Sequence, residues 1–125
     1  MSLPGLKPLR PSVLIVDDHA GFRESARGLL EAEGFDVVGM AGDSDEAMAE
    51  AIRLRPDLVL LDVRLPGVDG FGTAEMLAGL NPAPVVVVTS SHPVSSYRTQ
   101  LAAAPVRGFL AKSDLTGAAL AAFLV

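Results

Sequence analysis

Val13-Leu14-Ile15-Val16-Asp17-Asp18 decides the fold of this chain, and Leu58-Val59-Leu60-Leu61-Asp62 repeats its pattern. A short apolar run that stops at an acid is typical of a buried strand ending at the carboxyl edge of a parallel sheet. In open α/β sheets, ligands bind at this edge. Two unit charges about 4 Å apart repel by roughly 4 kcal/mol at an effective dielectric of 20, so three converging acids need a cation or a proton. We therefore expect a divalent ion that prefers oxygen ligands.

Short apolar runs alternate with helical patterns along the rest of the chain. The runs lie near residues 12–16, 35–40, 57–61, 84–88 and 107–110. Their Val, Leu and Ile content indicates strands buried on both faces, as in a parallel sheet. Five β-α units with short connections predict an α/β fold, a doubly wound five-stranded parallel sheet in a three-layer sandwich. Right-handed crossovers place helices on both faces of that sheet.

The helical stretches show apolar residues at helical spacing and recognisable ends. The first is expected to bury Phe22, Ala26, Leu29 and Leu30 and to end at Gly34 as a C-cap. The second is expected to start at Ser44, to bury Ala47, Met48, Ala51 and Ile52, and to stop at Pro56. Residues 69–80 and 94–104 are predicted as the third and fourth helices. We expect Ser113-Asp114 to cap a fifth helix that carries Leu115, Ala119, Leu120 and Phe123.

Composition bounds the function. The 125 residues suffice for one domain, predicted over 12–125 after a proline-rich leader at 1–11 that includes Met1-Ser2-Leu3 as an expression remnant. The net charge of −5 with scattered basic residues argues against direct nucleic-acid binding. No apolar run approaches the length of a membrane span. The absence of cysteine removes disulfides and thiol catalysis and fits a cytoplasmic protein.

Further polar residues follow the later strands, and together with the acids they form a specific set. Thr89 follows the valine run that ends at Val88, and Lys112 follows Gly108-Phe109-Leu110-Ala111. With Asp17-Asp18 and Asp62, this set resembles the receiver domain of two-component response regulators over residues 12 to about 124. The resemblance implies a flavodoxin-like sandwich with strand order 2-1-3-4-5.

The resemblance also implies a phosphorylation site. Asp62 would accept a phosphoryl group from a sensor histidine kinase as an acyl phosphate. Asp18 and Asp62 would ligate Mg²⁺, Asp17 would act directly or through water, and the backbone carbonyl of Arg64 would be a further ligand. Such a receiver catalyses only its own phosphorylation and dephosphorylation, so we expect no turnover of an external substrate.

The same resemblance assigns the residues that read the phosphoryl group. Lys112 would pair with phosphoryl oxygens as a point charge, Thr89 would donate its hydroxyl, and the amide of Ser90 would face the phosphate. Phe109 stands where the family places a rotating aromatic side chain. The surface formed by the fourth and fifth β-α units would then shift between two arrangements.

Other details resemble the branch that carries a C-terminal LuxR/NarL-type helix-turn-helix, which implies transcription regulation. They are Asp17-Asp18-His19, Phe22-Arg23 and Lys112-Ser113-Asp114-Leu115. Many receivers have a cis-linked proline where Ser113 stands, and a cis Lys-Ser bond would cost about 2.5–4 kcal/mol. Members of this branch often dimerise when phosphorylated. An apolar stripe of Leu120, Phe123 and Leu124 would favour such a homodimer.

Two other functions are weighed against the receiver. A Mg²⁺-dependent phosphatase of the haloacid dehalogenase type would need an Asp-x-Asp nucleophile on the first strand, where this chain has Asp17-Asp18-His19. An interaction module could keep the fold without phosphorylation, but the five site residues are all present. Residue by residue, strand-end acids are often helix caps, Phe109 could be core, and His19 and His92 are expected to be loop residues.

Overall fold

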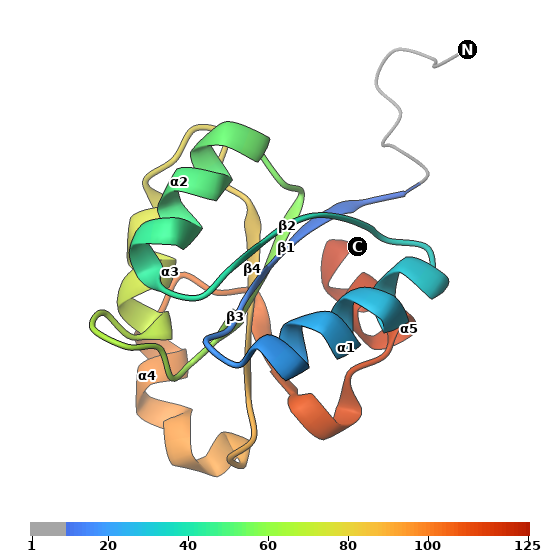
Figure 1. Ribbon diagram of the computed structural model, residues 1–125. Coiled ribbons are helices and arrows are strands. Elements are labelled where there is room, and N and C mark those ends of the chain that lie inside the picture. The colour runs from blue at the N-terminus through green and yellow to red at the C-terminus, as the bar shows by residue number, and fades with distance from the viewer. Residues whose placement is uncertain (1–9) are drawn as a thin grey trace.

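The computed structural model describes residues 10–125 and shows a parallel sheet between two layers of helices (Figure 1). The strands are β1 (Ser12–Val16), β2 (Asp36–Ala41), β3 (Leu58–Asp62), β4 (Val85–Ser90) and β5 (Gly108–Ala111). They lie in the order β2-β1-β3-β4-β5, which confirms the predicted doubly wound topology. The predicted leader lies almost entirely outside the described residues.

Successive side chains along the central strands point to opposite faces of the sheet and so divide the core into two halves. Leu14, Val16, Val59 and Leu61 face one layer and Val13, Ile15, Leu58 and Leu60 face the other, all of them fully buried. α1 and α5 cover one face of the sheet, while α2, α3 and α4 cover the other (Figure 1). The edge strands β2 and β5 are only partly buried. The expectation of burial on both faces is therefore correct for the centre of the sheet alone.

The helices that connect the strands vary in length and regularity. They are α1 (Ala20–Ala32), α2 (Ser44–Leu54), α3 (Gly70–Ala78), α4 (Arg98–Ala103) and α5 (Gly117–Ala121), with 3₁₀ turns η1 (Val94–Tyr97), η2 (Lys112–Asp114) and η3 (Ala122–Leu124). The fourth helix thus begins as a 3₁₀ turn, which the apolar spacing did not reveal. Within residues 10–125, no helix has both the length and the apolar character that crossing a membrane requires.

Three details differ from the sequence expectations. Ile52 is 59% exposed, because the inner stripe of α2 is formed by Ala47 and Ala51 and the next position turns away from it. The fifth helix is capped by Thr116, whose hydroxyl accepts from the Ala119 N–H, whereas Ser113 lies in η2. Leu120 is fully buried, so of the predicted apolar stripe only Phe123 and Leu124 are partly exposed.

Serine in place of proline leaves the peptide after Lys112 in the ordinary geometry. Among the described residues the cis peptide bond is found at Asn81–Pro82, and the Lys112–Ser113 bond is trans. The trans bond agrees with the cost of a cis bond at a residue other than proline. Lys112 therefore enters η2 directly from the end of β5.

Candidate functional site

The carboxyl ends of β1 and β3 bring the acidic residues together. The two strands pair in parallel with Val16 opposite Leu61, so Asp17 and Asp62 are the next residues on neighbouring strands. One ligand atom from each of Asp17, Asp18, His19 and Asp62 lies within 4.8 Å of the others. The predicted convergence of three acids is present, and His19 joins it although the sequence indicated only a loop residue.

Asp17 is the most deeply buried member of this cluster. Its side chain is fully buried, and Oδ1 accepts a hydrogen bond of 2.8 Å from the His19 N–H. Oδ2 lies 2.6 Å from Nζ of Lys112, with which it forms a buried ion pair. This buried carboxylate is therefore neutralised in part by the Lys112 cation, which it shares with Asp62.

Asp62 is the second buried acid, and the ammonium of Lys112 bridges it to Asp17. It is 3% exposed; its Oδ1 accepts from the Arg64 N–H at 3.2 Å and its Oδ2 from Lys112 Nζ at 3.3 Å. Burial raises the pKa of the Asp62 carboxyl; the Asp17 charge adds to the rise, and the Arg64 N–H and Lys112 only partly oppose it. Negative charge on Asp62 is therefore undercompensated, which favours binding of a divalent cation beside it.

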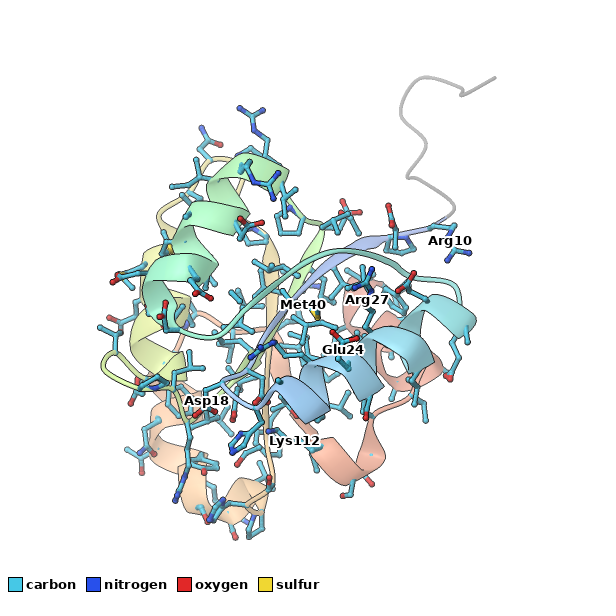
Figure 2. The ribbon with its side chains drawn as sticks, in the orientation of Figure 1. Arg10, Asp18, Glu24, Arg27, Met40 and Lys112 are labelled. Carbon is cyan, nitrogen blue, oxygen red and sulfur yellow. The ribbon has the colours of Figure 1, made fainter. Side chains whose placement is uncertain are left out.

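Lys112 closes the site from β5. Figure 2 places its side chain at the same edge of the sheet as Asp18, and its Nζ lies 4.4 Å from the centroid of the Phe22 ring. Burial acts to lower the pKa of Lys112, but the Asp17 and Asp62 carboxylates outweigh it and raise the pKa. Lys112 therefore remains a cation that holds two buried acids in place.

The other predicted residues lie on β4 and β5, and among them Thr89 is the neighbour of Asp62. Thr89 pairs with Asp62 in the strand register and is 1% exposed. Ser90 is equally buried, and its Oγ is occupied by contacts with Tyr97 and the His92 N–H. Phe109 is half-buried and packs against the Tyr97 ring, 6.2 Å between centroids.

The backbone around Asp62 is as closely fitted as its side chain. A Cβ at Gly70 would collide with the Asp62 carbonyl, so glycine lets the N-terminus of α3 pack directly behind the acid. Gly67 has a φ of +73°, which lets the loop between β3 and α3 turn. Arg64, whose carbonyl was predicted as a metal ligand, contacts Asp62 through its N–H.

Two residues of this region escaped the sequence reasoning. His19 places Nδ1 3.2 Å from Asp17 and 3.0 Å from Asp18, and only its adjacency to these acids could have indicated this. Tyr97 contributes a buried hydroxyl beside Ser90, for which the sequence carries no local signal. The aspartate carboxylates form a donor set that fits Mg²⁺, which takes oxygen ligands and several waters, whereas the imidazole of His19 is not a ligand that Mg²⁺ prefers.

Comparison with known proteins agrees with this geometry. The family described as the response regulator receiver domain matches residues 13–121. The receiver domain of the putative response regulator NarL from Mycobacterium tuberculosis superposes with a TM-score of 0.82 at 30% identity, covering 94% of this chain and 98% of that one.

Curated relatives have a longer chain than this one. A protein-glutamate methylesterase/protein-glutamine glutaminase from Anaeromyxobacter dehalogenans is 44% identical over 79 residues, which are 62% of this chain and 23% of the relative. The transcriptional regulatory protein PdtaR from Mycobacterium tuberculosis is 42% identical over 78 residues, which are 62% of this chain and 38% of the relative. The aligned region thus spans between about a quarter and two fifths of these relatives.

Proposed function

Because this chain belongs to the response regulator receiver domain family, we propose that Asp62 is the acceptor through which a sensor histidine kinase switches it. The observation that carries the proposal is the buried Asp62 carboxylate, which lies beside a second buried acid, Asp17, and shares with it the ammonium of Lys112. A phosphatase of the haloacid dehalogenase type is not favoured, because its nucleophile would lie on the first strand and the family matched is a different one. The receiver is a regulator and turns over no external substrate.

The proposed reaction is a phosphoryl transfer to the carboxylate. An oxygen of Asp62 forms a bond to phosphorus as the bond from phosphorus to the kinase imidazole nitrogen breaks, and that nitrogen keeps the electron pair and takes up a proton. The product is an acyl phosphate on Asp62 and a free histidine on the kinase. Mg²⁺ supplies charge neutralisation for the transferring group when it is bound.

The residues around Asp62 would bind the metal ion and compensate the charge of the phosphoryl group. Asp18, Asp62 and the carbonyl of Arg64 would hold the ion, with Asp17 binding it directly or through water. Lys112, which contacts both Asp17 and Asp62, would follow the negative charge onto the phosphoryl oxygens. Its cationic form is secured by these carboxylates, because they raise its pKa.

The signal would leave the site through the neighbouring strands. Phosphorylation adds roughly −1.5 to −2 charge beside Thr89, which would donate its hydroxyl to the phosphate, and Ser90 would offer its amide. Phe109 would change its packing, so the surface of α4, β5 and α5 would take a second arrangement. Val94, which is 44% exposed next to this surface, could join a homodimer contact after phosphorylation.

The proposed output is transcription regulation. We propose that an output domain outside this chain carries it out. The support is the similarity to the NarL receiver domain at 30% identity and to PdtaR, which is named as a transcriptional regulatory protein. Dimerisation of receivers on phosphorylation would bring two DNA-binding parts to paired half-sites. The net charge of −5 makes direct DNA contact by this chain unfavourable.

Intact-mass spectrometry tests the assignment of Asp62. Incubation with acetyl phosphate and Mg²⁺ should add one phosphoryl group that hydroxylamine removes. Asp62→Asn should lose this adduct, whereas Asp57→Asn should keep it, because Asp57 precedes the other end of β3 and bonds to Ser12. An Asp62→Asn protein that gains the group as fast as the parent would contradict the proposal.

A further inference from the structure

Tyr97 anchors the segment that follows β4. It ends η1 and is 7% exposed, and it is the single tyrosine in a chain without tryptophan. Its ring lies between Phe71 of α3 and Phe109 of β5, with centroids 6.0 Å and 6.2 Å away. Tilted aromatic pairs of this kind add to the burial that holds a ring in place. Within residues 94–103, which form η1 and α4, Tyr97 is the one buried residue.

The hydroxyl of Tyr97 reaches the end of β4. Its oxygen lies 3.1 Å from Ser90 Oγ in a buried hydrogen bond, in which either hydroxyl can be the donor. Ser90 Oγ also accepts a hydrogen bond of 3.0 Å from the His92 N–H. The chain of contacts from Tyr97 through Ser90 to His92 therefore closes the turn after β4. Removing one partner would leave a buried hydroxyl without its bond.

This turn is attached directly to the proposed phosphorylation site. Ser90 follows Thr89, which pairs with Asp62 and accepts a 2.9 Å hydrogen bond from the Val63 N–H. The backbone on both sides of the acid is thus fixed to β4. Ser90 is the last residue of β4, where its pairing with Ala111 of β5 ends the strand, and its side-chain bond to Tyr97 is the contact that ties this end to η1.

We propose that Tyr97 is a positioning residue for phosphoryl transfer, acting through Ser90 to hold the turn after β4 against Asp62. This inference rests on the proposed function of Asp62. Tyr97 holds Ser90 so that the Ser90 amide and the Thr89 hydroxyl face an incoming phosphoryl group. The same hydrogen bond anchors η1 and α4, which lie beside the carboxyl end of β4 (Figure 1). The environment of the Tyr97 ring therefore depends on whether Asp62 carries the group.

Two conservative variants separate the hydrogen bond from the packing. Tyr97→Phe keeps the ring and removes its hydroxyl, and Ser90→Ala removes the partner. Tyr97→Phe should slow phosphoryl uptake from acetyl phosphate by roughly 2- to 12-fold, the effect of one hydrogen bond. Ser90→Ala, which also removes the bond from the His92 N–H, should slow it at least as much, and the double variant should be no slower than Ser90→Ala. Ser44→Ala is the matched control, because it breaks another buried hydroxyl pair, 2.8 Å from Thr73, on α2.

Tyrosine fluorescence provides a readout that a loss of stability would not mimic. All intrinsic tyrosine emission comes from Tyr97. Beryllofluoride with Mg²⁺, which mimics the phosphoryl group on Asp62, should change this emission in the parent and in Ser44→Ala. The change should be at least halved in Ser90→Ala and absent in Asp62→Asn.

The outcomes distinguish this inference from the proposed function. A parent protein that gains no phosphoryl mass with acetyl phosphate and Mg²⁺ would overturn both. If the parent gains the mass while its Tyr97 emission stays constant, or if Tyr97→Phe and Ser90→Ala react at the parent rate, the role of Tyr97 is refuted and that of Asp62 stands. Equal slowing in Ser44→Ala would also refute it, since a general loss of stability would then explain the effect.

Discussion

Replacing Asp62 with asparagine should stabilise the metal-free protein. The asparagine side chain would keep an oxygen for the Arg64 N–H, but its amide group cannot also accept from Lys112, which bonds to the other oxygen of Asp62. The substitution therefore removes the charge together with the contact to Lys112. Burial and the charge of Asp17 raise the pKa of Asp62 and so disfavour its ionised form. The charge that suits Asp62 to its proposed chemistry is therefore a cost to the fold in the absence of a divalent ion.

The size of this cost follows from three opposing contributions. Asp17 and Asp62 oxygens within 4.8 Å repel by about 3.5 kcal/mol at an effective dielectric of 20. Lys112 at 3.3 Å attracts Asp62 by about 5 kcal/mol on the same scale, so the charges alone favour ionised Asp62 by roughly 1.5 kcal/mol. Burying a carboxylate costs several kcal/mol, which leaves a net destabilisation of about 1–2 kcal/mol.

The dependence on pH follows from the direction of the shift. Because the folded-state pKa of Asp62 is raised, the stability due to its protonated form is fully present below the unfolded value, about 3.9, and is lost as the pH rises through the folded pKa. The advantage of Asp62→Asn should therefore be small below about pH 4 and should grow above the folded pKa of Asp62.

Urea unfolding at about pH 7 in EDTA measures this difference. Asp62→Asn should unfold with a free energy about 1–2 kcal/mol higher than the parent, or about 4–8 °C higher in Tm. Mg²⁺ at 100 times its Kd should stabilise the parent by about 2.7 kcal/mol and Asp62→Asn by less, which narrows or reverses the gap. Asp57→Asn, just before the start of β3, should unfold in EDTA with the free energy of the parent, and Mg²⁺ should stabilise it as much as the parent. An Asp62→Asn protein no more stable than the parent in EDTA would refute the reasoning.

Three further outcomes are expected from the same site and its surface. Lys112→Met keeps an apolar side chain over Phe22 but leaves two buried acids without their cation. It should lower the free energy of unfolding in EDTA by about 2–4 kcal/mol, and a loss below about 1 kcal/mol would contradict the stabilising role of the ion pairs. Asp18→Ala should weaken Mg²⁺ binding at least about tenfold in an NMR titration, while Asp45→Ala should not, and equal affinities would remove Asp18 from the site. Beryllofluoride with Mg²⁺ should shift the parent protein toward a dimer in sedimentation velocity, and an unchanged monomer at saturating mimic would refute dimerisation.

The order of the elements and the location of the site follow from local sequence patterns. Apolar runs such as Val13–Val16 and Leu58–Leu61 are buried whatever their neighbours, and an acid at the end of each must lie at the carboxyl edge of a parallel sheet. The proximity of Asp17 and Asp62 could therefore be predicted. The helices were predictable to within a few residues, except where α4 begins as a 3₁₀ turn and where Thr116 caps α5.

Contacts between side chains from distant elements were decided only by the tertiary structure. Lys112 lies 50 residues from Asp62 in the chain, yet its ammonium bonds to that acid and contacts Asp17 as well. Tyr97 contacts Ser90 because the short segment after β4 brings the Tyr97 ring against Phe71 and Phe109, which come from other elements. The sequence determined which residues reach the carboxyl edge, because burial of strands follows a local pattern of apolar residues. The structure decided which of them touch and which charges are left undercompensated, because side-chain direction and desolvation depend on how separate elements pack together.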